Sequence, residues 1–232
     1  MGGLVKRLLI LWCFLHGSLA SAEPMSMDFD VRFGGVKIGE MTVRGDETAE
    51  KYSAEGILRT TGLAGAVYNI EYRYSANGQV TGDRFLPDKF TALNRESGRV
   101  NSQIITYRSD KINSVQFWPE AQVGDDVIGQ KGTLDPMTLI YVLMRPMDAQ
   151  KPCGLVADLH DGKNRFRVTS TLAARSSTGG VTCDIAYTHK GKETGGLSPS
   201  GVVFEPNAKG EMVVDWFAAK TNIGILRIIR KK

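Results

Sequence analysis

Four side chains of the types that transfer protons or bind metals lie in the second half of the sequence: Asp158, His160, Asp161 and His189. Imidazole and carboxylate groups are common zinc ligands, and a histidine beside a carboxylate can act as an acid or base. His189 can join the other three only if the strands that carry them are neighbours. Strand-end histidines beside a turn aspartate are more common than such sites, so we expect no catalytic residue and no metal. A hydrolase or metal-dependent enzyme that uses these four residues is the alternative.

Other sequences that resemble chemical motifs are incomplete. Gly196 to Ser200 reads GLSPS, which lacks the last glycine of a serine nucleophile elbow. Asp125-Asp126 lacks the spaced oxygen ligands of a calcium loop and predicts a solvated turn. Glycine motifs for dinucleotides or phosphates do not occur in the sequence. We therefore expect no cofactor and a protein that is not an enzyme.

The beginning of the sequence predicts export. Lys6 and Arg7 precede an apolar run from Leu8 to Leu15, and Ala20-Ser21-Ala22 has the small-x-small pattern of a signal cleavage site. The run is well short of the roughly 20 residues that a membrane span needs. We expect residues 1–22 to be a cleaved signal peptide and residues 23–232 to form a single β-rich domain. The expected location is the periplasm, with no transmembrane span after cleavage.

The net charge argues against a nucleic-acid-binding protein, and the cysteine content predicts a disulfide. Lys6 and Arg7 would leave with the signal peptide, which carries no acid, so the net charge would fall from +4 to +2. This excess is too small to indicate nucleic-acid binding. Cys13 would also leave, and the remaining pair, Cys153 and Cys183, predicts a disulfide in an exported chain.

The segment LDPMTLIYVLMRP, residues 134–146, predicts a short helix. Asp135 can cap the first free amides, and Pro136 suits the first helical position. Thr138 is the only polar residue between Pro136 and Arg145, so no side of the helix is suited to water. We expect an enclosed helix over about residues 135–145, which is too short to cross a bilayer.

Alternation of apolar and polar residues predicts strands along most of the remaining chain. Residues 27–33 and 36–43 are expected to form a hairpin with a β-bulge at Gly39. Asn77-Gly78, Ser109-Asp110 and Asp161-Gly162 are expected at turns, and Lys190 to Gly201 in a loose loop. Further strands are expected at residues 52–60, 70–74, 79–81, 90–95, 99–108, 111–117, 154–160, 164–171, 181–189, 212–219 and 224–229. The predicted fold class is mainly β: a strongly curved antiparallel sheet or open β-barrel wrapped on one short buried helix.

Aromatic residues on the predicted strands give the best indication of function. Most should fill the concave face of a curved sheet, while a few could line an apolar cleft between sheet and helix. We therefore expect a non-enzymatic binding protein for an apolar ligand or a cell-envelope partner. The alternative is a structural envelope-interaction module without a ligand cavity. The candidate lining residues are Tyr72, Tyr74, Tyr107, Phe117, Trp118, Leu139 and Tyr141.

Several short motifs resemble the exported proteobacterial proteins of the domain of unknown function 3108 (DUF3108) family. They are Gly34-Gly35, Gly39-Glu40, Thr61-Gly62-Leu63, Pro87, Asp135-Pro136, Asp161-Gly162 and Arg165-Phe166. Cys153 and Cys183 resemble the cysteine pair of proteobacterial members. The resemblance implies no catalytic residues, since the family has none assigned. The expected architecture is similar to that of periplasmic lipoprotein-carrier and envelope-integrity proteins, which implies a lipid, an acyl chain, a lipoprotein or an envelope protein as partner. The helix is shorter than such carriers use.

Overall fold

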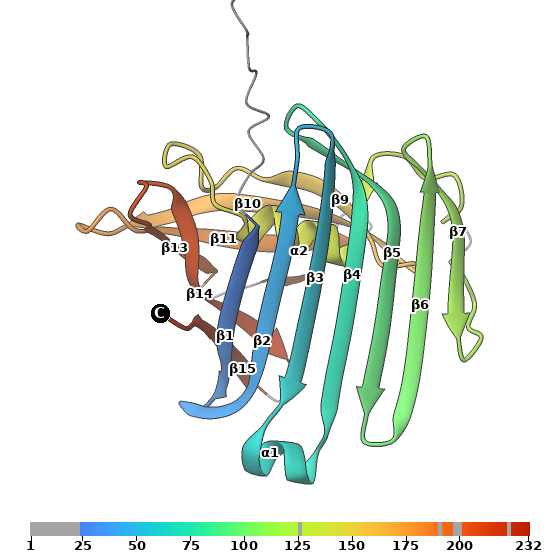
Figure 1. Ribbon diagram of the computed structural model, residues 1–232, viewed down its shortest axis with the longest axis horizontal. Coiled ribbons are helices and arrows are strands. Elements are labelled where there is room, and N and C mark those ends of the chain that lie inside the picture. Colours follow the sequence, from blue (N-terminus) through green and yellow to red (C-terminus); the bar gives the residue numbers. More distant parts are fainter. Residues whose placement is uncertain (1–23, 125–126, 190–191, 197–200, 222–223) are drawn as a thin grey trace, which may run out of the picture.

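The computed structural model describes residues 24–124, 127–189, 192–196, 201–221 and 224–232 (Figure 1). In these ranges the chain is mainly β, with fifteen strands in one sheet and two short helices. The expected signal peptide, Asp125-Asp126 and most of the GLSPS sequence lie outside the described residues. The predicted fold class is confirmed.

The elements follow one another along the chain with short connections. They are β1 (Met25–Phe33), β2 (Val36–Glu47), β3 (Lys51–Thr60), α1 (Gly62–Val67), β4 (Ile70–Thr81), β5 (Arg84–Glu96), β6 (Arg99–Arg108), β7 (Lys111–Trp118), β8 (Thr133–Leu134), α2 (Pro136–Met144), β9 (Val156–His160), β10 (Arg165–Arg175), β11 (Val181–His189), β12 (Lys192–Gly196), β13 (Val202–Pro206), β14 (Met212–Thr221) and β15 (Gly224–Arg230).

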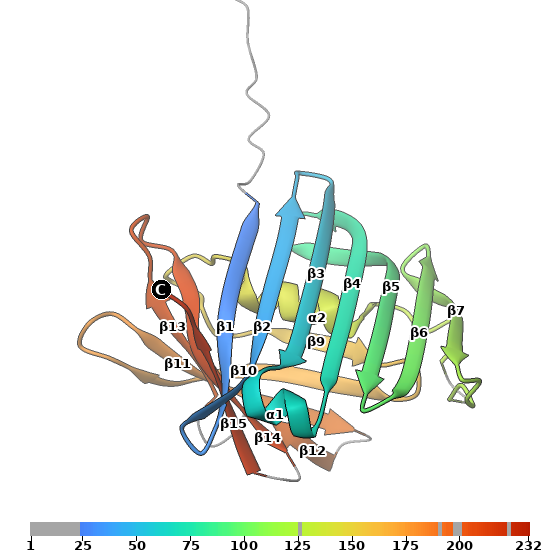
Figure 2. The same ribbon diagram turned by 60° about the horizontal axis from the view of Figure 1, so that its bottom comes forward.

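The sheet runs in the order β7-β6-β5-β4-β3-β2-β1-β15-β14-β13-β11-β10-β9-β8, and β12 pairs with β11. Among these described strands the pairs are antiparallel except β8 with β9. The sheet bends so strongly that β1 to β7 form a front layer, while the later strands lie behind it (Figures 1 and 2). Helix α2 lies between the two layers.

The two ends of the bent sheet approach each other. The backbone N–H of Ile112 in β7 donates to Gln130 O at 2.9 Å, just before β8. Gln103 Nε2 in β6 donates to Asp161 O at 2.7 Å, in the β9–β10 turn. The Lys163 ammonium of that turn lies 5.1 Å from the centre of the Phe117 ring. These contacts make the sheet barrel-like around α2.

Helix α2 begins as the sequence predicts. Asp135 Oδ1 accepts hydrogen bonds from the backbone N–H groups of Met137 and Thr138, both at 2.9 Å. Such a cap satisfies amides that the first turn leaves free. Met137, Thr138, Leu139, Tyr141 and Met144 are buried, which confirms the enclosed helix. Neither described helix is long and apolar enough to cross a membrane.

The front layer approaches α2 closely where a strand carries glycine. The Tyr141 ring of α2 stacks 6.0 Å from the Tyr52 ring and meets the Phe85 ring edge-on at 5.9 Å. A Cβ added to Gly45 in β2 would lie 2.2 Å from the Tyr141 ring. Because a real side chain cannot occupy that position, the glycine is required by packing and not by a turn.

Two turn predictions have opposite outcomes. Ser109 and Asp110 have φ values of 50° and 62° between β6 and β7, which suits the predicted tight turn. The turn predicted at Asn77-Gly78 is wrong, because β4 continues through both residues with a register shift and ends at Thr81. A Cβ on Gly78 would lie 2.8 Å from the Tyr52 ring and 2.2 Å from Leu86 O, so this glycine makes room for packing.

For the other predicted elements, the structure confirms one and changes the bounds of others. The bulge near Gly39 is confirmed by the register shift opposite Val31 and Arg32. Residues 79–81 belong to β4, so they are not a separate strand. The segment Lys190 to Gly201 is only partly a loop, because Lys192–Gly196 pairs with β11 as β12. The sequence did not predict α1, β8 or β13.

Candidate functional site

Asp158 and His160, both on β9, make separate contacts with nearby residues. Asp158 forms ion pairs with two β10 arginines, at 2.6 Å to Arg165 and 3.3 Å to Arg167. His160 is 1% exposed, and its Nδ1 accepts a hydrogen bond from the Gly162 N–H at 2.8 Å. Burial lowers the pKa of His160, which favours the neutral ring. Both side chains therefore stabilise the β9–β10 hairpin.

Asp161 and His189 complete the set without forming a common site. Asp161 Oδ1 accepts from the N–H groups of Lys163 at 2.8 Å and Asn164 at 2.7 Å, as expected at a turn. His189 lies on β11, with its Nδ1 2.9 Å from Arg165 O. Strand β10 separates β9 from β11, so the two histidines are two strand spacings apart, roughly 10 Å. Within the described ranges, no group of three or more His, Cys, Asp or Glu residues is placed to hold a metal ion.

The predicted disulfide between Cys153 and Cys183 is present, with the two Cα atoms 5.6 Å apart. Cys183 lies on β11 and is fully buried, as its place on the apolar face of that strand predicts. The bridge closes a loop over a sequence separation of 30 residues. It ties the segment before β9 to β11 across β10.

The residues expected to line a cleft between sheet and helix mostly pack on one another. Leu139 and Tyr141 of α2 are each 3% exposed. Tyr72 and Tyr74 stack at 6.4 Å on β4, and Tyr74 meets the Phe90 ring at 5.9 Å. These residues contribute to the core and its margin.

The last three candidate lining residues lie toward the free edge of the front layer. Tyr107 on β6 packs against the core, and burial raises the pKa of its hydroxyl. Phe117 on β7 faces the same interior and contacts Lys163. Trp118 does not face the helix: it pairs with Ser102, and its side chain is 61% exposed on the opposite face. Successive strand residues point to opposite faces, so Phe117 and Trp118 cannot line the same cleft.

A buried polar network links α2 to the front layer. Thr138 Oγ1 donates to Asp135 Oδ2 at 2.6 Å and lies 2.7 Å from the Tyr52 hydroxyl. Since Thr138 uses its hydrogen on Asp135, the Tyr52 hydroxyl is the donor to Thr138. Burial raises the pKa of Asp135 to about 6, against the opposing effect of its hydrogen bonds from Thr138 and Met137. This network fixes the helix in the barrel and has no solvent access for a substrate.

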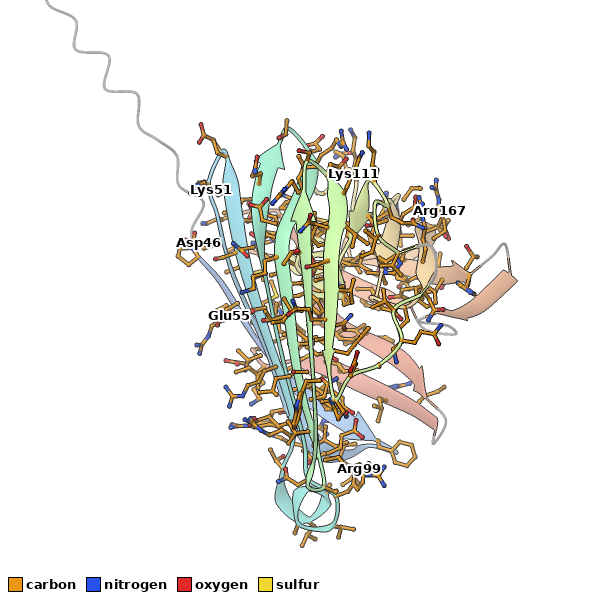
Figure 3. The ribbon with its side chains drawn as sticks, turned by 90° about the vertical axis from the view of Figure 1, so that its right-hand side faces the viewer. Asp46, Lys51, Glu55, Arg99, Lys111 and Arg167 are labelled. Carbon is orange, nitrogen blue, oxygen red and sulfur yellow. A yellow bond between two sulfur atoms is a disulfide. The ribbon has the colours of Figure 1, made fainter. Side chains whose placement is uncertain are left out.

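A hollow lies on the other side of the front layer, facing away from α2. It has a volume of about 390 Å³. A Cβ on Gly56 would point at Met137 of α2, so the neighbouring Glu55 and Ile57 face outward. Figure 3 shows Glu55 pointing away from the rear layer. The lining comes from β3 to β6: Glu55, Gly56, Ile57, Arg73, Tyr74, Ser75, Thr91, Ala92, Leu93, Ser102, Gln103 and Ile104.

The floor of this hollow is apolar where water-exposed sheet faces are usually polar. Ile57, Leu93 and Ile104 supply outward-facing apolar side chains from β3, β5 and β6, and each is only half-buried. Arg73 lies between Ile57 and Leu93 in the register of the strands. Its guanidinium bonds Glu71, two residues along β4, so the side chain lies beside this apolar floor.

A second hollow of about 220 Å³ shares Glu55, Ile57 and Arg73 with the first. We call the two together the outer trough. The second hollow adds Glu40, Thr42, Arg44 and Arg59 to the lining.

The charges of the outer trough are mostly arranged in ion pairs. Arg59 lies 3.3 Å from Glu40, and Arg73 lies 2.9 Å from Glu71. Hydrogen bonds from Lys37, Lys231 and Arg59 lower the pKa of Glu40 to about 2. The trough thus combines an apolar floor with three guanidinium groups and two carboxylates at the walls of its second hollow, an excess of positive charge that suits a molecule with an apolar body and an anionic group.

Sequence reasoning missed the outer trough because its residues are spread over five strands. Ile57, Leu93 and Ile104 each break the polar side of an alternating pattern, which is the signal that could have found them. Their proximity depends on the register of β3 to β6, and that register includes the bulge at Asn77 and Gly78. No local sequence signal fixes such a register.

Comparisons with known proteins concern the fold and the family. The chain is similar to the crystal structure of a beta-barrel-like protein of domain of unknown function DUF1849 from Brucella abortus, with a TM-score of 0.53 and 11% sequence identity. The match covers 90% of this chain and 96% of that chain, and at this identity it shows a shared fold. No curated protein matches the sequence.

A family model described as "Protein of unknown function (DUF3108)" matches residues 28–212. This range spans the described elements from β1 into β14, including Gly34-Gly35, the Asp135-Pro136 helix start and both cysteines of the disulfide. The chain therefore belongs to the DUF3108 family.

Proposed function

We propose that this protein is a non-enzymatic binding protein of the periplasm and that its ligand is a small amphiphile with an apolar chain and an anionic group. The observation that carries the proposal is the apolar floor of the outer trough beside arginine side chains. Its larger hollow, about 390 Å³, falls within the range of small-molecule sites, roughly 300–1,000 Å³. An acyl chain would lie across Ile57, Leu93 and Ile104.

The arginines would recognise the anionic group. Arg73 lies beside the floor and shares Glu71 with Arg95, so two guanidinium groups face one carboxylate. Arg44 lines the trough opposite Glu55 in the register of β2 and β3, and neither has an ion pair among the described residues; the lining of the second hollow still holds three arginines, Arg44, Arg59 and Arg73, against two carboxylates, Glu40 and Glu55. A carboxylate or phosphate on the ligand would balance this local excess of positive charge through charge-assisted hydrogen bonds.

Calorimetric titration with dodecanoate tests the proposal. Leu93→Asp places a charge on the apolar floor and should weaken binding at least about tenfold, because burying an apolar side chain of this size contributes about 1.5 kcal/mol or more. Leu172→Asp is the matched control, since Leu172 is an exposed strand leucine on β10, outside the trough. Equal affinities of the wild type and the Leu93→Asp variant, with both folded, would refute the site.

The anionic group has a separate test. Arg73→Gln should weaken dodecanoate binding while leaving the affinity for uncharged methyl dodecanoate within about twofold, because only the carboxylate pairs with a guanidinium. Native mass spectrometry after incubation should recover each ligand unchanged. A chemically altered ligand would instead support an enzyme.

The proposed location rests on the predicted signal peptide and agrees with the Cys153–Cys183 disulfide, a bond that persists in oxidising compartments. Fractionation of cells that produce the protein, followed by N-terminal sequencing, should find a periplasmic chain that starts at Glu23. A cytoplasmic chain that retains residues 1–22 would contradict it.

A second candidate function is an envelope-interaction module that needs no bound ligand. It is favoured by the exposed apolar side chains of α1, Leu63 and Val67. On this alternative, dodecanoate would not bind, and function would depend on a surface contact.

A further inference from the structure

The end of the molecule that carries α1 exposes more large apolar side chains than the rest of the described chain. Ten such side chains are exposed in the described ranges, and six of them lie at this end. We define the α1 tip by these six residues: Phe33, Val36, Leu63, Val67, Tyr68 and Ile225. Apolar side chains gathered in this way on a surface mark a site of contact with a partner or a membrane.

Backbone contacts hold the parts of the α1 tip together. Thr61 N–H, at the start of α1, donates to Ile38 O in β2 at 3.0 Å. Ser97 N–H, in the β5–β6 turn, donates to Asn69 O at 2.8 Å, just after α1. In β15, Leu226 pairs with Phe33, which places Ile225 beside the β1–β2 turn. Figures 1 and 2 show α1 projecting beyond the strand ends.

Helix α1 presents its two largest apolar side chains to solvent. Leu63 is 89% exposed and Val67 is 87% exposed, and none of the helix residues is buried. Positions four apart lie on the same side of a helix, so Leu63 and Val67 form one apolar face. Since this face contributes little to the core, its apolar character is not explained by packing within the chain.

Positive charge surrounds the base of the α1 tip. Arg32, Lys37, Arg59 and Lys231 form a network with only two carboxylates, Asp30 and Glu40. Lys37 bonds both acids, at 2.9 Å to Asp30 and 2.8 Å to Glu40. The network therefore has an excess of two positive charges.

The β5 side of the tip is also basic. Arg73 and Arg95 share Glu71, which leaves one further positive charge. Arg99, in the strand next to β5, is exposed and has no ion pair with a described residue. Figure 3 shows Arg99 at the same end as α1, above the helix. Glu96 of the same turn accepts a hydrogen bond from the Tyr72 hydroxyl, and it offsets only one of these charges.

We propose that the α1 tip docks on an anionic phospholipid bilayer, with Leu63 and Val67 at the boundary between headgroups and acyl chains. The arginines and lysines at the base of the tip then lie at the level of the lipid phosphates. Apolar insertion and attraction of basic residues to anionic lipid act together in peripheral membrane binding. The two side chains that project furthest into solvent, Leu63 and Val67, are aliphatic, which fits a bilayer better than a protein interface, whose centre is usually rich in aromatic residues and closely complementary in shape.

Cosedimentation of the purified protein with vesicles tests this docking. Vesicles of phosphatidylglycerol and phosphatidylethanolamine should bind the protein, and vesicles of phosphatidylcholine should bind it at least about tenfold more weakly. The double variant Leu63→Asp, Val67→Asp should lose about tenfold or more in binding to the anionic vesicles. The matched control Ile128→Asp, Val156→Asp changes two exposed apolar residues outside the tip and should bind as the wild type does.

Two arginines at opposite ends of β6 test how much positive charge contributes to vesicle binding. Arg99→Glu, at the start of β6 beside α1, should weaken binding severalfold, and added salt should weaken the wild type likewise. Arg108→Glu, an exposed arginine at the other end of β6, should leave binding unchanged. Three results would overturn the proposal. They are equal binding to neutral and anionic vesicles, no binding to either kind of vesicle, and loss of binding in both double variants. Self-association abolished by Leu63→Asp, without vesicle binding, would assign the tip to contacts between copies.

Discussion

The two helices of this protein are both short and apolar, yet one is enclosed and the other projects into solvent. Helix α2 has nine residues, a capping aspartate and five buried side chains. Helix α1 has six residues, no side-chain hydrogen bond from Thr61 at its N-cap, and no buried side chain. Apolar composition alone therefore does not determine burial. The two helices differ in the residue that caps the N-terminus, Asp135 or Thr61, and in where each helix lies relative to the sheet.

The strands on either side of each helix determine where that helix lies relative to the sheet. The segment from β8 through α2 crosses the inside of the bent sheet, where Gly45 and Gly56 leave room for Tyr141 and Met137. The α1 segment connects two neighbouring strands, β3 and β4, at their ends. A connection of that kind remains outside the core, whatever its composition.

The largest expected contrast comes from one substitution made in both helices. Leu139→Ala in α2 should lower the free energy of unfolding by about 2–5 kcal/mol, because it leaves a cavity in the core. Leu63→Ala in α1 should change it by less than about 0.5 kcal/mol. Urea denaturation of both variants measures the difference. Similar losses in the two would show that α1 is packed in solution and would end the comparison.

The cap of α2 should make stability depend on pH. The pKa of Asp135 in the folded protein is raised to about 6, above its ordinary value near 4, so folding favours the protonated acid. The stabilisation is fully present below about pH 4 and is lost as pH rises through about 6, a total of about 3 kcal/mol.

Asp135→Asn isolates this effect, since asparagine also caps helices and does not ionise. The unfolding free energy of the variant minus that of the wild type should increase by about 3 kcal/mol between pH 4 and pH 7. Groups such as Glu40, whose pKa is lowered, titrate alike in both proteins and cancel in the difference. A constant difference across this range would show that the carboxyl is not desolvated as described.

The close approach of α2 to β2 predicts a smaller effect. Gly45→Ala should cost about 1–3 kcal/mol of stability, because the new methyl group would overlap the Tyr141 ring. Combining it with Tyr141→Leu should recover part of the loss, since the smaller side chain vacates the space. Strict additivity of the two changes in thermal unfolding would contradict the contact.

The smallest expected effect concerns the hydrogen bond between sheet and helix. Tyr52→Phe removes the donor to Thr138 and should cost about 1 kcal/mol. Thr61→Ala at the start of α1, where the side chain makes no cap bond, should cost less than about 0.5 kcal/mol. Thermal melts of the two variants rank them, and the reverse order would count against the buried network.

Local signals predicted a large part of the fold. The cap and proline at Asp135-Pro136 defined α2 to within a residue, and alternation defined β6 and most of β7. An even number of cysteines in the expected mature chain was enough to predict the disulfide. In each case the determining residues are adjacent in sequence or belong to a set with one possible pairing.

Long-range packing explains what the sequence did not reveal. Asn77-Gly78 has the residues of a hairpin turn, but Gly78 is needed beside Tyr52, a residue of another strand. The outer trough was not predicted, since Ile57, Leu93 and Ile104 meet only after four strands are in register. Helix α1 was missed because its two glycines weaken the helical pattern.

The pairing of β1 with β15 joins the two extremes of the described chain in the middle of the sheet, with Phe29 opposite Arg230. Until that late strand arrives, β1 and β14 each present an unpaired edge to other molecules. Assembly of this barrel should therefore be slow relative to helical proteins of the same size. While β15 is still missing, those two edges are therefore where pairing with a neighbouring copy of the chain would begin.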